Sequence, residues 1–373
     1  MNLVYTDEQK MLKESVERFV AETYVGRDKA QDCDAAIWKQ FADLGWLSLL
    51  APEEAGGLGA GAVESGIVME AFGRGLVSEP FMTSVVLCGD LIANLATPAQ
   101  KEDLLGRLAA GELKLGFAHE ETSRFAPLPI ACKATRTAEG WRLDGKKPFA
   151  LDAGTADLLL VVARIEGDAS SRKGLGVFLV PAGVKGLTLQ AFPRLGGGTG
   201  ARLAFDHVQL GPEARLGEGA GEETFAAIER AMDKATAALS CEALGMMQAL
   251  LEKTVAYAKQ RVQFDRALAA NQVVRHRLAD MAIACEEARS LSLRACLLAD
   301  SDAGARAAAA SGAKAKIARH ARFVAEQAVQ LHGGMGVTEE LDIGRYLKRA
   351  VAYEARFGDS AFHLARRASA HAA

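Results

Sequence analysis

The chain has 373 residues, of which 50% are hydrophobic and 24% charged, and its formal net charge at neutral pH is −3. This length exceeds what one hydrophobic core usually supports, so two or three packed units are expected. The nearly balanced charge offers no basic surface for nucleic acid or an anionic membrane, and no apolar run reaches the ~20 residues that span a bilayer.

The six cysteines are scattered along the chain, with no Cys-x-x-Cys pair and no histidine at metal-ligand spacing. We therefore expect reduced thiols, no bound metal and a cytoplasmic location. The N-terminal segment is acidic and amphipathic, which is unlike a signal peptide.

Residues 1–115 follow a helical pattern and are expected to form an N-terminal α-helical domain. Thr6 and Gln9 have the spacing of a capping box at the start of the first helix. The glycine-rich stretch from Pro52 to Gly59 cannot be regular structure and interrupts the helices. The later helical runs are expected at residues 35–47, 62–77, 80–96 and 98–110.

Residues 116–215 change in character and are expected to form a middle β-barrel domain. Short runs rich in Val, Leu and Phe lie between Gly, Pro and Asp residues, a spacing typical of a small antiparallel barrel. Asp144-Gly145 is a hairpin signal within this region. The expected strands include residues 158–164, 176–180, 187–192 and 203–210.

Residues 220–373 return to a helical pattern with runs longer than the globular average, which favours an antiparallel four-helix bundle. The expected helices are residues 222–263, 270–300, 303–332 and 342–368. The fold class is therefore α+β, with helices first, then a strand-rich unit, then a bundle of long helices.

Two segments of this last region carry the most specific patterns. The first is QLHGGMG at residues 330–336, where three glycines in four positions remove side chains and let backbone approach a ligand. Taken alone, it also fits a helix C-cap followed by a turn. The second is YAKQRVQFDRAL at residues 257–268, where basic residues lie near the end of a helix.

Together these segments resemble the acyl-CoA dehydrogenases, a family of FAD flavoproteins. QLHGGMG is followed by TEE and RYLK, and YAKQRVQFDRAL by LADM, as in the family's C-terminal signatures. The resemblance implies that the glycine loop holds the ADP end of a flavin bound mainly by a neighbouring subunit, and that Arg261 pairs with the pyrophosphate. One departure is Asp265, which stands where the family usually has Gly. The other residues implied for FAD at this end are Gln263, Phe264, Gln272, Gln330, Gly333 and Gly334.

The strand-rich region departs further from the family pattern. FAHEETSR at residues 117–124 stands where members usually carry A-x-T-E-P-x-x-G-S-D, with His119 in place of Thr. Ser123 is expected to keep a hydroxyl, and Phe149 to cover the flavin face. Leu151, however, has no hydroxyl to hydrogen-bond the reactive nitrogen, so this chain's own flavin pocket is expected to be degraded.

The catalytic base is also missing from the usual places. The reaction removes an α-proton from a CoA thioester while a hydride leaves the β-carbon, and a buried carboxylate is the natural base. The two positions that the resemblance implies hold Phe357 and Ala235. The nearby acids that could substitute are Glu242, Asp233 and Glu354, so the catalytic residue stays unassigned.

Some acyl-CoA dehydrogenases consist of two unlike subunits, and the run GDSAFHLAR at residues 358–366 is most similar to the small subunits of pimeloyl-CoA-type enzymes. We therefore expect a subunit that completes the FAD site of a partner carrying the base, in a homo- or hetero-oligomer such as a dimer of dimers. The expected substrate is an acyl-CoA, and an electron-transfer protein accepts the electrons. Two alternatives stay open: a self-sufficient homo-oligomer using Glu242, and a flavin-free paralogue that binds or scaffolds.

Overall fold

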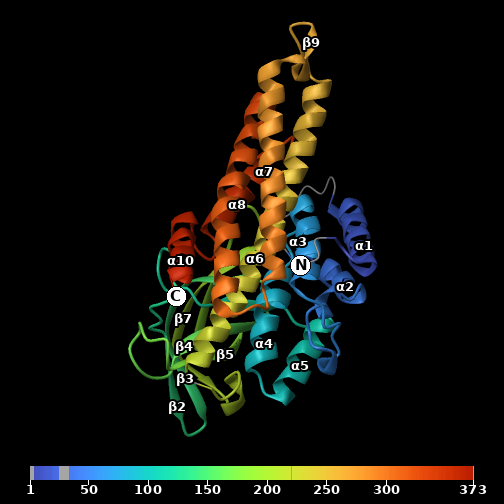
Figure 1. Ribbon diagram of the computed structural model, residues 1–373. Coiled ribbons are helices and arrows are strands. Elements are labelled where there is room, and N and C mark those ends of the chain that lie inside the picture. The colour runs from blue at the N-terminus through green and yellow to red at the C-terminus, as the bar shows by residue number, and fades with distance from the viewer. Residues whose placement is uncertain (1–3, 25–32, 220, 373) are drawn as a thin grey trace.

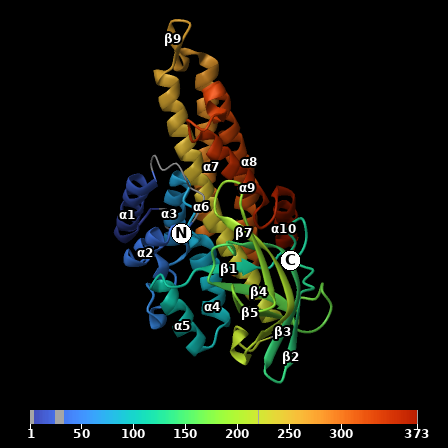
Figure 2. The ribbon, with the colours of Figure 1, turned by 180° about the vertical axis from the view of Figure 1, so that it is seen from behind.

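The computed structural model describes residues 4–24, 33–219 and 221–372. Helices from the N-terminal part lie beside the lower half of a bundle of long helices, and a sheet covers the opposite side of that lower half (Figures 1 and 2). One helical hairpin of the bundle projects well beyond all other elements. In the described part of the chain, we find no helix that has both the length and the apolar character to span a membrane.

The N-terminal helices form because their caps and apolar faces agree. Thr6 and Gln9 make the expected capping box, in which the Gln9 amide nitrogen donates to Thr6 Oγ1 at 3.2 Å. Aromatic side chains such as Trp38, Phe41 and Phe72 pack into one buried cluster, with the Phe41 and Phe72 rings stacked. The elements are α1 (Asp7–Tyr24), α2 (Ala35–Asp43), α3 (Ala62–Gly75), the π-helix η3 (Met82–Cys88), α4 (Gly89–Leu95) and α5 (Pro98–Ala109).

The strands between residues 115 and 210 form one seven-stranded sheet, in which not all pairings are antiparallel as the sequence predicted. Most pairings are antiparallel, but β1 and β4 run parallel over four residue pairs, and β2 and β4 also pair parallel. β1 also pairs with β3, through Phe117 and Leu151. The strands β1, β4, β2 and β3 are therefore connected in a closed ring of pairings. The strands are β1 (Leu115–Ala118), β2 (Lys133–Thr137), β3 (Gly140–Leu151), β4 (Leu158–Arg164), β5 (Leu175–Pro181), β6 (Leu187–Pro193) and β7 (Thr199–Leu210).

The predicted hairpin turn at Asp144-Gly145 is wrong. These residues lie inside β3, where the register against β7 shifts between Leu143 and Gly145. Gly145 has a φ of 142°, so the flexible pair serves a β-bulge rather than a turn.

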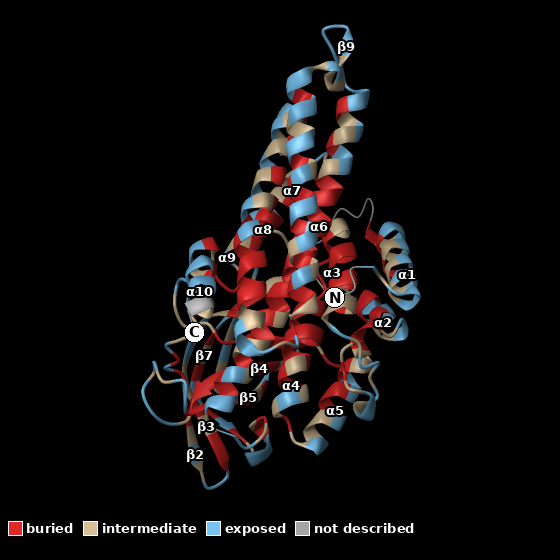
Figure 3. Cartoon of the chain, in the orientation of Figure 1, coloured by how far each residue is buried: buried red, intermediate tan, exposed pale blue. Residues whose placement is uncertain are grey.

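The C-terminal helices match the expected runs closely, except for the last. The stretch 342–368 was expected to be one helix, but it breaks at Phe357-Gly358, both of which have positive φ. Buried side chains concentrate in the lower half of the bundle, whereas the projecting hairpin is mostly exposed (Figure 3). The elements are α6 (Glu222–Gln260), β8 (Val262–Gln263), β9 (Arg266–Ala267), α7 (Gln272–Leu297), α8 (Ala303–His332), the 3₁₀ turn η6 (Gly333–Val337), α9 (Ile343–Ala355) and α10 (Ser360–Ala372).

Candidate functional site

The projecting end of the bundle, which we call the tip, consists of the end of α6, β8, β9, the start of α7, and η6. Arg261 caps α6, and its amide donates to the Tyr257 carbonyl at 2.8 Å. The Tyr257 ring stacks on His332, with ring centroids 4.4 Å apart, and His332 leads directly into the glycine loop. The Arg277 guanidinium donates to Gln327 Oε1 at 2.7 Å, which joins α7 to α8 one turn before Gln330. The structure therefore brings the two signature segments to the same end of the bundle.

The side chains predicted for the tip point into solvent rather than into a pocket of their own chain. Phe264 is 96% exposed, which is unusual for a large apolar ring. A Cβ placed on Gly333 or Gly334 would meet no atom within 4 Å, so their backbone is open to an approaching group. The residues predicted to bind FAD at the tip are all exposed: Arg261, Gln263, Phe264, Gln272, Gln330, Gly333 and Gly334.

The backbone conformation at Asp265 partly explains how aspartate can stand where the family usually has glycine. Its φ is 60°, and the preceding Phe264 has a φ of 53°. Glycine adopts this left-handed region without strain, and aspartate tolerates it better than most residues do. The acidic side chain is exposed and hence free to point away from a bound anion.

The other two predicted residues, Ser123 and Phe149, lie elsewhere, in a cavity of about 530 Å³ between the sheet and α9. Guanidinium and aromatic groups wall this cavity, among them Arg194, Arg356 and Phe192. Arg194 donates to Asp152 at 2.8 Å, while its buried Nε has no hydrogen-bond partner. An unmatched donor of this kind beside flat apolar walls fits a ring system that offers hydrogen-bond acceptors, such as a flavin.

The tip and this cavity cannot hold the same ligand molecule of one chain. Met232 of α6 borders a small void beside this cavity, and Arg261, which caps the same helix, comes 29 residues later. At 1.5 Å per residue this separates them by about 43 Å, farther than a dinucleotide reaches. A single dinucleotide in the cavity therefore cannot contact the tip of the same chain.

A smaller void of about 10 Å³ adjoins the cavity, and Glu120 borders both. The Phe357 ring borders this void, at one of the two positions that the family resemblance implies for the catalytic base. Leu151 contributes its apolar side chain to the same void. His119 is 2% exposed, and its Nε2 lies 3.1 Å from the Pro127 carbonyl while Nδ1 has no partner. Burial and the nearby Lys147 ammonium lower the pKa of His119 to about 3, so the imidazole is neutral.

Of the three acids considered as substitutes for the base, Glu242 is engaged in a buried ion-pair network. The Arg349 guanidinium donates to Glu242 Oε1 at 2.6 Å, and Arg356 approaches Oε2 at 3.7 Å. Arg349 also donates to the Leu76 and Val77 carbonyls, so the network joins α6 and α9 to the N-terminal helices. Glu242 thus has a structural role that accounts for its burial.

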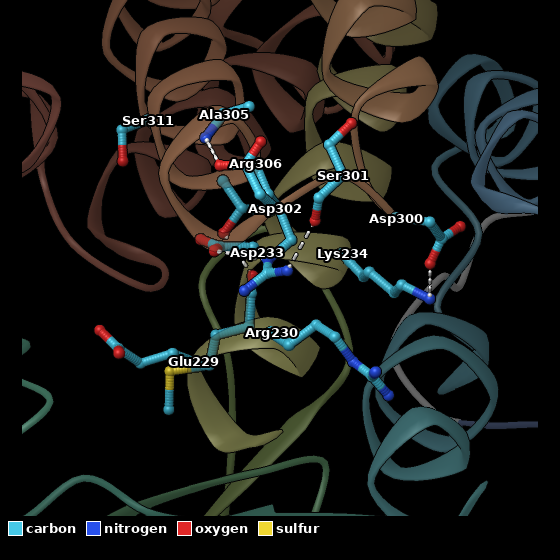
Figure 4. A network of polar contacts seen from close by, with 12 residues as sticks. Glu229, Arg230, Asp233, Lys234, Asp300, Ser301, Asp302, Ala305, Arg306 and Ser311 are labelled. Atoms are coloured by element: carbon cyan, nitrogen blue, oxygen red, sulfur yellow. Dashed lines mark hydrogen bonds and ion pairs between the residues drawn. The ribbon is translucent and has the colours of Figure 1, made fainter. Parts of the chain in front are cut away.

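The other two acids are also paired. Asp233 accepts from Arg306 Nε at 3.3 Å and from Arg366 Nη2 at 3.1 Å, within the polar network of Figure 4. Glu354 lies 3.7 Å from Arg322 and does not line the cavity. Ala235, at the second usual position for the base, is fully buried within α6. Sequence reasoning missed Glu120, whose only signal was its place inside the altered FAHEETSR motif.

Another polar cluster lies away from the tip and from the cavity, on the neighbouring strands β3 and β7. His207 Nδ1 lies 2.7 Å from Asp206 and 3.5 Å from Asp144, so the three groups are close enough to share a cation. This cluster could not be predicted from the sequence, because Asp144 lies in β3 whereas Asp206 and His207 lie in β7. The two carboxylates suffice to hold the imidazole in place.

Comparison with known proteins finds three family models that together match most of the chain. Family models for the acyl-CoA dehydrogenase N-terminal, middle and C-terminal domains match residues 6–112, 120–208 and 224–370. The chain belongs to the acyl-CoA dehydrogenase family. It is an oxidoreductase of this family, and the cofactor of acyl-CoA dehydrogenases is FAD.

The similarity to relatives and solved structures extends over nearly the full length of this chain. The chain is 31% identical over 371 residues to the mitochondrial isovaleryl-CoA dehydrogenase of Solanum tuberosum, covering 96% of this chain and 89% of that protein. Butyryl-CoA dehydrogenase from Megasphaera elsdenii has a TM-score of 0.91 and 25% identity, with both chains fully covered. A chain of the ChsE4–ChsE5 complex from Mycobacterium tuberculosis has a TM-score of 0.87 and 26% identity, covering 100% of this chain and 99% of that one.

Proposed function

We propose that this acyl-CoA dehydrogenase acts as a subunit whose tip completes the FAD site of a neighbouring chain, where that neighbour supplies the base for α,β-dehydrogenation of a CoA thioester. The observation that supports this most strongly is the separation of about 43 Å along α6 between the tip and the chain's own cavity. Residues that suit a pyrophosphate lie on an exposed surface, where a second chain can present the rest of the ligand.

The pairing of the substitute acids argues against a self-sufficient homo-oligomer that uses Glu242 as its base. Glu242 and Asp233 each contact two arginines, and Phe357 and Ala235 cannot act as bases. A complex of two named chains, ChsE4 and ChsE5, is among the similar structures. We extend the proposal to a hetero-oligomer related to the pimeloyl-CoA-type small subunits, arranged as a dimer of dimers.

The remaining parts of the proposal follow from the reaction class. The substrate is an acyl-CoA of a β-oxidation-like pathway, and a separate electron-transfer protein takes up the electrons from the reduced cofactor. All six cysteines are free thiols and five of them are buried, which agrees with the reducing conditions of a cytoplasmic location.

The experiment is a titration of FAD into the assembled protein with Arg261→Met in this chain. Loss of a charge-assisted contact of about 1.5–3 kcal/mol predicts a 10- to 100-fold weaker affinity. Arg18→Met, which removes an equally exposed arginine from α1, is the control and should leave the affinity unchanged. Equal FAD affinities for Arg261→Met and the wild type would contradict the proposal.

Flavin content separates the alternatives. The chain purified alone should be colourless or hold less than one FAD per chain, and adding a base-bearing partner should restore both colour and turnover. A self-sufficient enzyme would instead be yellow alone and bleach with an acyl-CoA. A flavin-free paralogue would stay colourless with every partner.

A further inference from the structure

Glu120 occupies an unusual position for a carboxyl group. It follows β1 and borders both the 530 Å³ cavity and the small inner void. The inner void is otherwise lined by apolar or aromatic side chains and one imidazole, from Phe117, His119, Phe125, Leu151, Met232 and Phe357. Side chains from β1 and the loop after it, β3, α6 and the turn after α9 thus surround one acid with groups that do not neutralise it.

The charged groups near Glu120 are engaged with other partners. The next residue, Glu121, accepts from Lys147 Nζ at 2.6 Å, and Arg124 donates to Asp359 at 2.6 Å. On the far wall of the cavity, Arg194 donates to Asp152 and Arg356 faces Glu242. Across residues 4–24, 33–219 and 221–372, no hydrogen bond or ion pair reaches the Glu120 side chain.

Two groups therefore point to a ligand at the same place. Besides the unpaired carboxyl, His119 Nδ1 is a buried nitrogen without a partner in the adjacent void. Because buried polar groups are nearly always hydrogen-bonded, the unpaired His119 Nδ1 beside the half-buried, unpartnered Glu120 carboxyl indicates a site whose partner is a bound molecule.

Burial also places the acid in the range where proton transfer is efficient. Desolvation raises the pKa of Glu120 from 4.5 to about 7. Since the folded-state pKa lies above the unfolded one, the contribution of this group to stability is complete below pH 4.5 and is lost as the pH rises through about 7. An acid that destabilises the fold at neutral pH and lines a cavity is a candidate for function.

We propose that Glu120 is the catalytic base of this chain's own cavity and takes the α-proton of a CoA thioester whose acyl end enters there. The α-C–H bond breaks and the proton binds the carboxylate. The β-hydride passes to oxidised flavin as the two-electron acceptor, and the electron pair left on Cα becomes the α,β double bond. The substrate class rests on the proposed function, but the site is distinct, because that function concerns the flavin completed in a neighbour.

The test is release of deuterium from butyryl-CoA labelled at Cα, measured by mass spectrometry with the FAD-loaded assembly. Where a partner chain co-purifies, its own base is first changed from Glu to Gln, so that any release reports on this chain. The wild type should release deuterium at a rate that rises with pH to a plateau above about 7. Glu120→Gln should lower the rate at least about 100-fold while retaining flavin absorbance, and Glu120→Asp should restore part of it.

Glu112→Gln, an exposed acid just before β1, is the matched control and should behave as the wild type. A second measurement covers folding: Glu120→Gln should be more stable to urea than the wild type at pH 8 and lose this advantage at pH 4. Release that is absent in the wild type, or unchanged in Glu120→Gln, overturns the proposal.

The two experiments can contradict either proposal without contradicting the other. If Arg261→Met leaves FAD affinity unchanged but Glu120→Gln abolishes release, the tip function falls and Glu120 stands as the base. If Arg261→Met weakens FAD binding and Glu120→Gln changes nothing, the inference on Glu120 falls and the tip function stands.

Discussion

Glu242 and Glu120 show how the same residue type acquires different roles from its surroundings. The sequence drew attention to Glu242, because small and apolar residues flank it in α6, and not to Glu120, which stands among polar residues. In the structure Glu242 meets Arg349 and Arg356, whereas Glu120 meets aromatic rings and an open cavity. Burial alone does not identify a catalytic acid, since a buried acid with cationic partners is already accounted for.

The role of Glu242 gives a prediction about stability. Glu242→Gln should lower the free energy of unfolding by about 3 kcal/mol, because two buried guanidinium groups lose their counter-charge. Urea denaturation measures this, with Glu112→Gln as an exposed control that should change little. A stable Glu242→Gln variant whose turnover is abolished would instead restore Glu242 as the candidate base.

At the scale of elements, the break between α9 and α10 decides what fills the inner void. The chain reverses at Phe357-Gly358, where φ is 56° and 109°. Lys314, fully buried in α8, donates to the Glu354 and Gly358 carbonyls at 3.1 and 2.9 Å, and so satisfies backbone groups that the helix end leaves open. The turn holds the Phe357 ring where a base would otherwise stand.

This turn should be sensitive to a single methyl group. Gly358→Ala should destabilise the protein by at least about 2 kcal/mol, because its φ is strained for alanine and the new Cβ would lie 2.4 Å from the Phe362 ring. Gly106→Ala is the control: its Cβ meets nothing within 4 Å in α5, and it should gain about 0.5–1 kcal/mol. Thermal unfolding measures the melting temperatures of both variants. A melting temperature of Gly358→Ala equal to that of the wild type would contradict the prediction.

At the scale of the whole molecule, the α6–α7 hairpin projects beyond the other elements and is mostly exposed (Figures 1 and 3). Exposed Val262, Phe264, Val273 and Val337 gather on the tip elements. An apolar surface rimmed by polar groups is typical of an interface. We therefore expect the tip to lie in an interface with another chain.

Phe264→Ser tests that view of the tip. Since the ring is 96% exposed, the stability of the separated chain should change by less than about 0.5 kcal/mol. The dissociation constant of the oligomer, measured by sedimentation velocity, should rise about 10-fold or more. Met11→Ser, which removes another exposed side chain from α1, should leave association unchanged, and equal constants for both variants would contradict the prediction.

The sequence by itself determined the helical and strand-rich succession and the family. Hydrophobic periodicity, caps and the two C-terminal signatures are local patterns, so the span of α8 and most strand positions could be predicted from them. Local patterns gave wrong predictions where contacts with another segment determined the backbone conformation. Asp144-Gly145 lies at a bulge against β7, and the last predicted helix breaks at Gly358.

Only the tertiary structure decided which side chains meet. The stacking of Tyr257 on His332, which unites the two signatures, joins residues 75 positions apart. The pairing of Glu242 with Arg349 and the isolation of Glu120 likewise depend on segments that are distant along the chain. Charge compensation and desolvation act through space at a few ångströms, and a sequence does not record those distances.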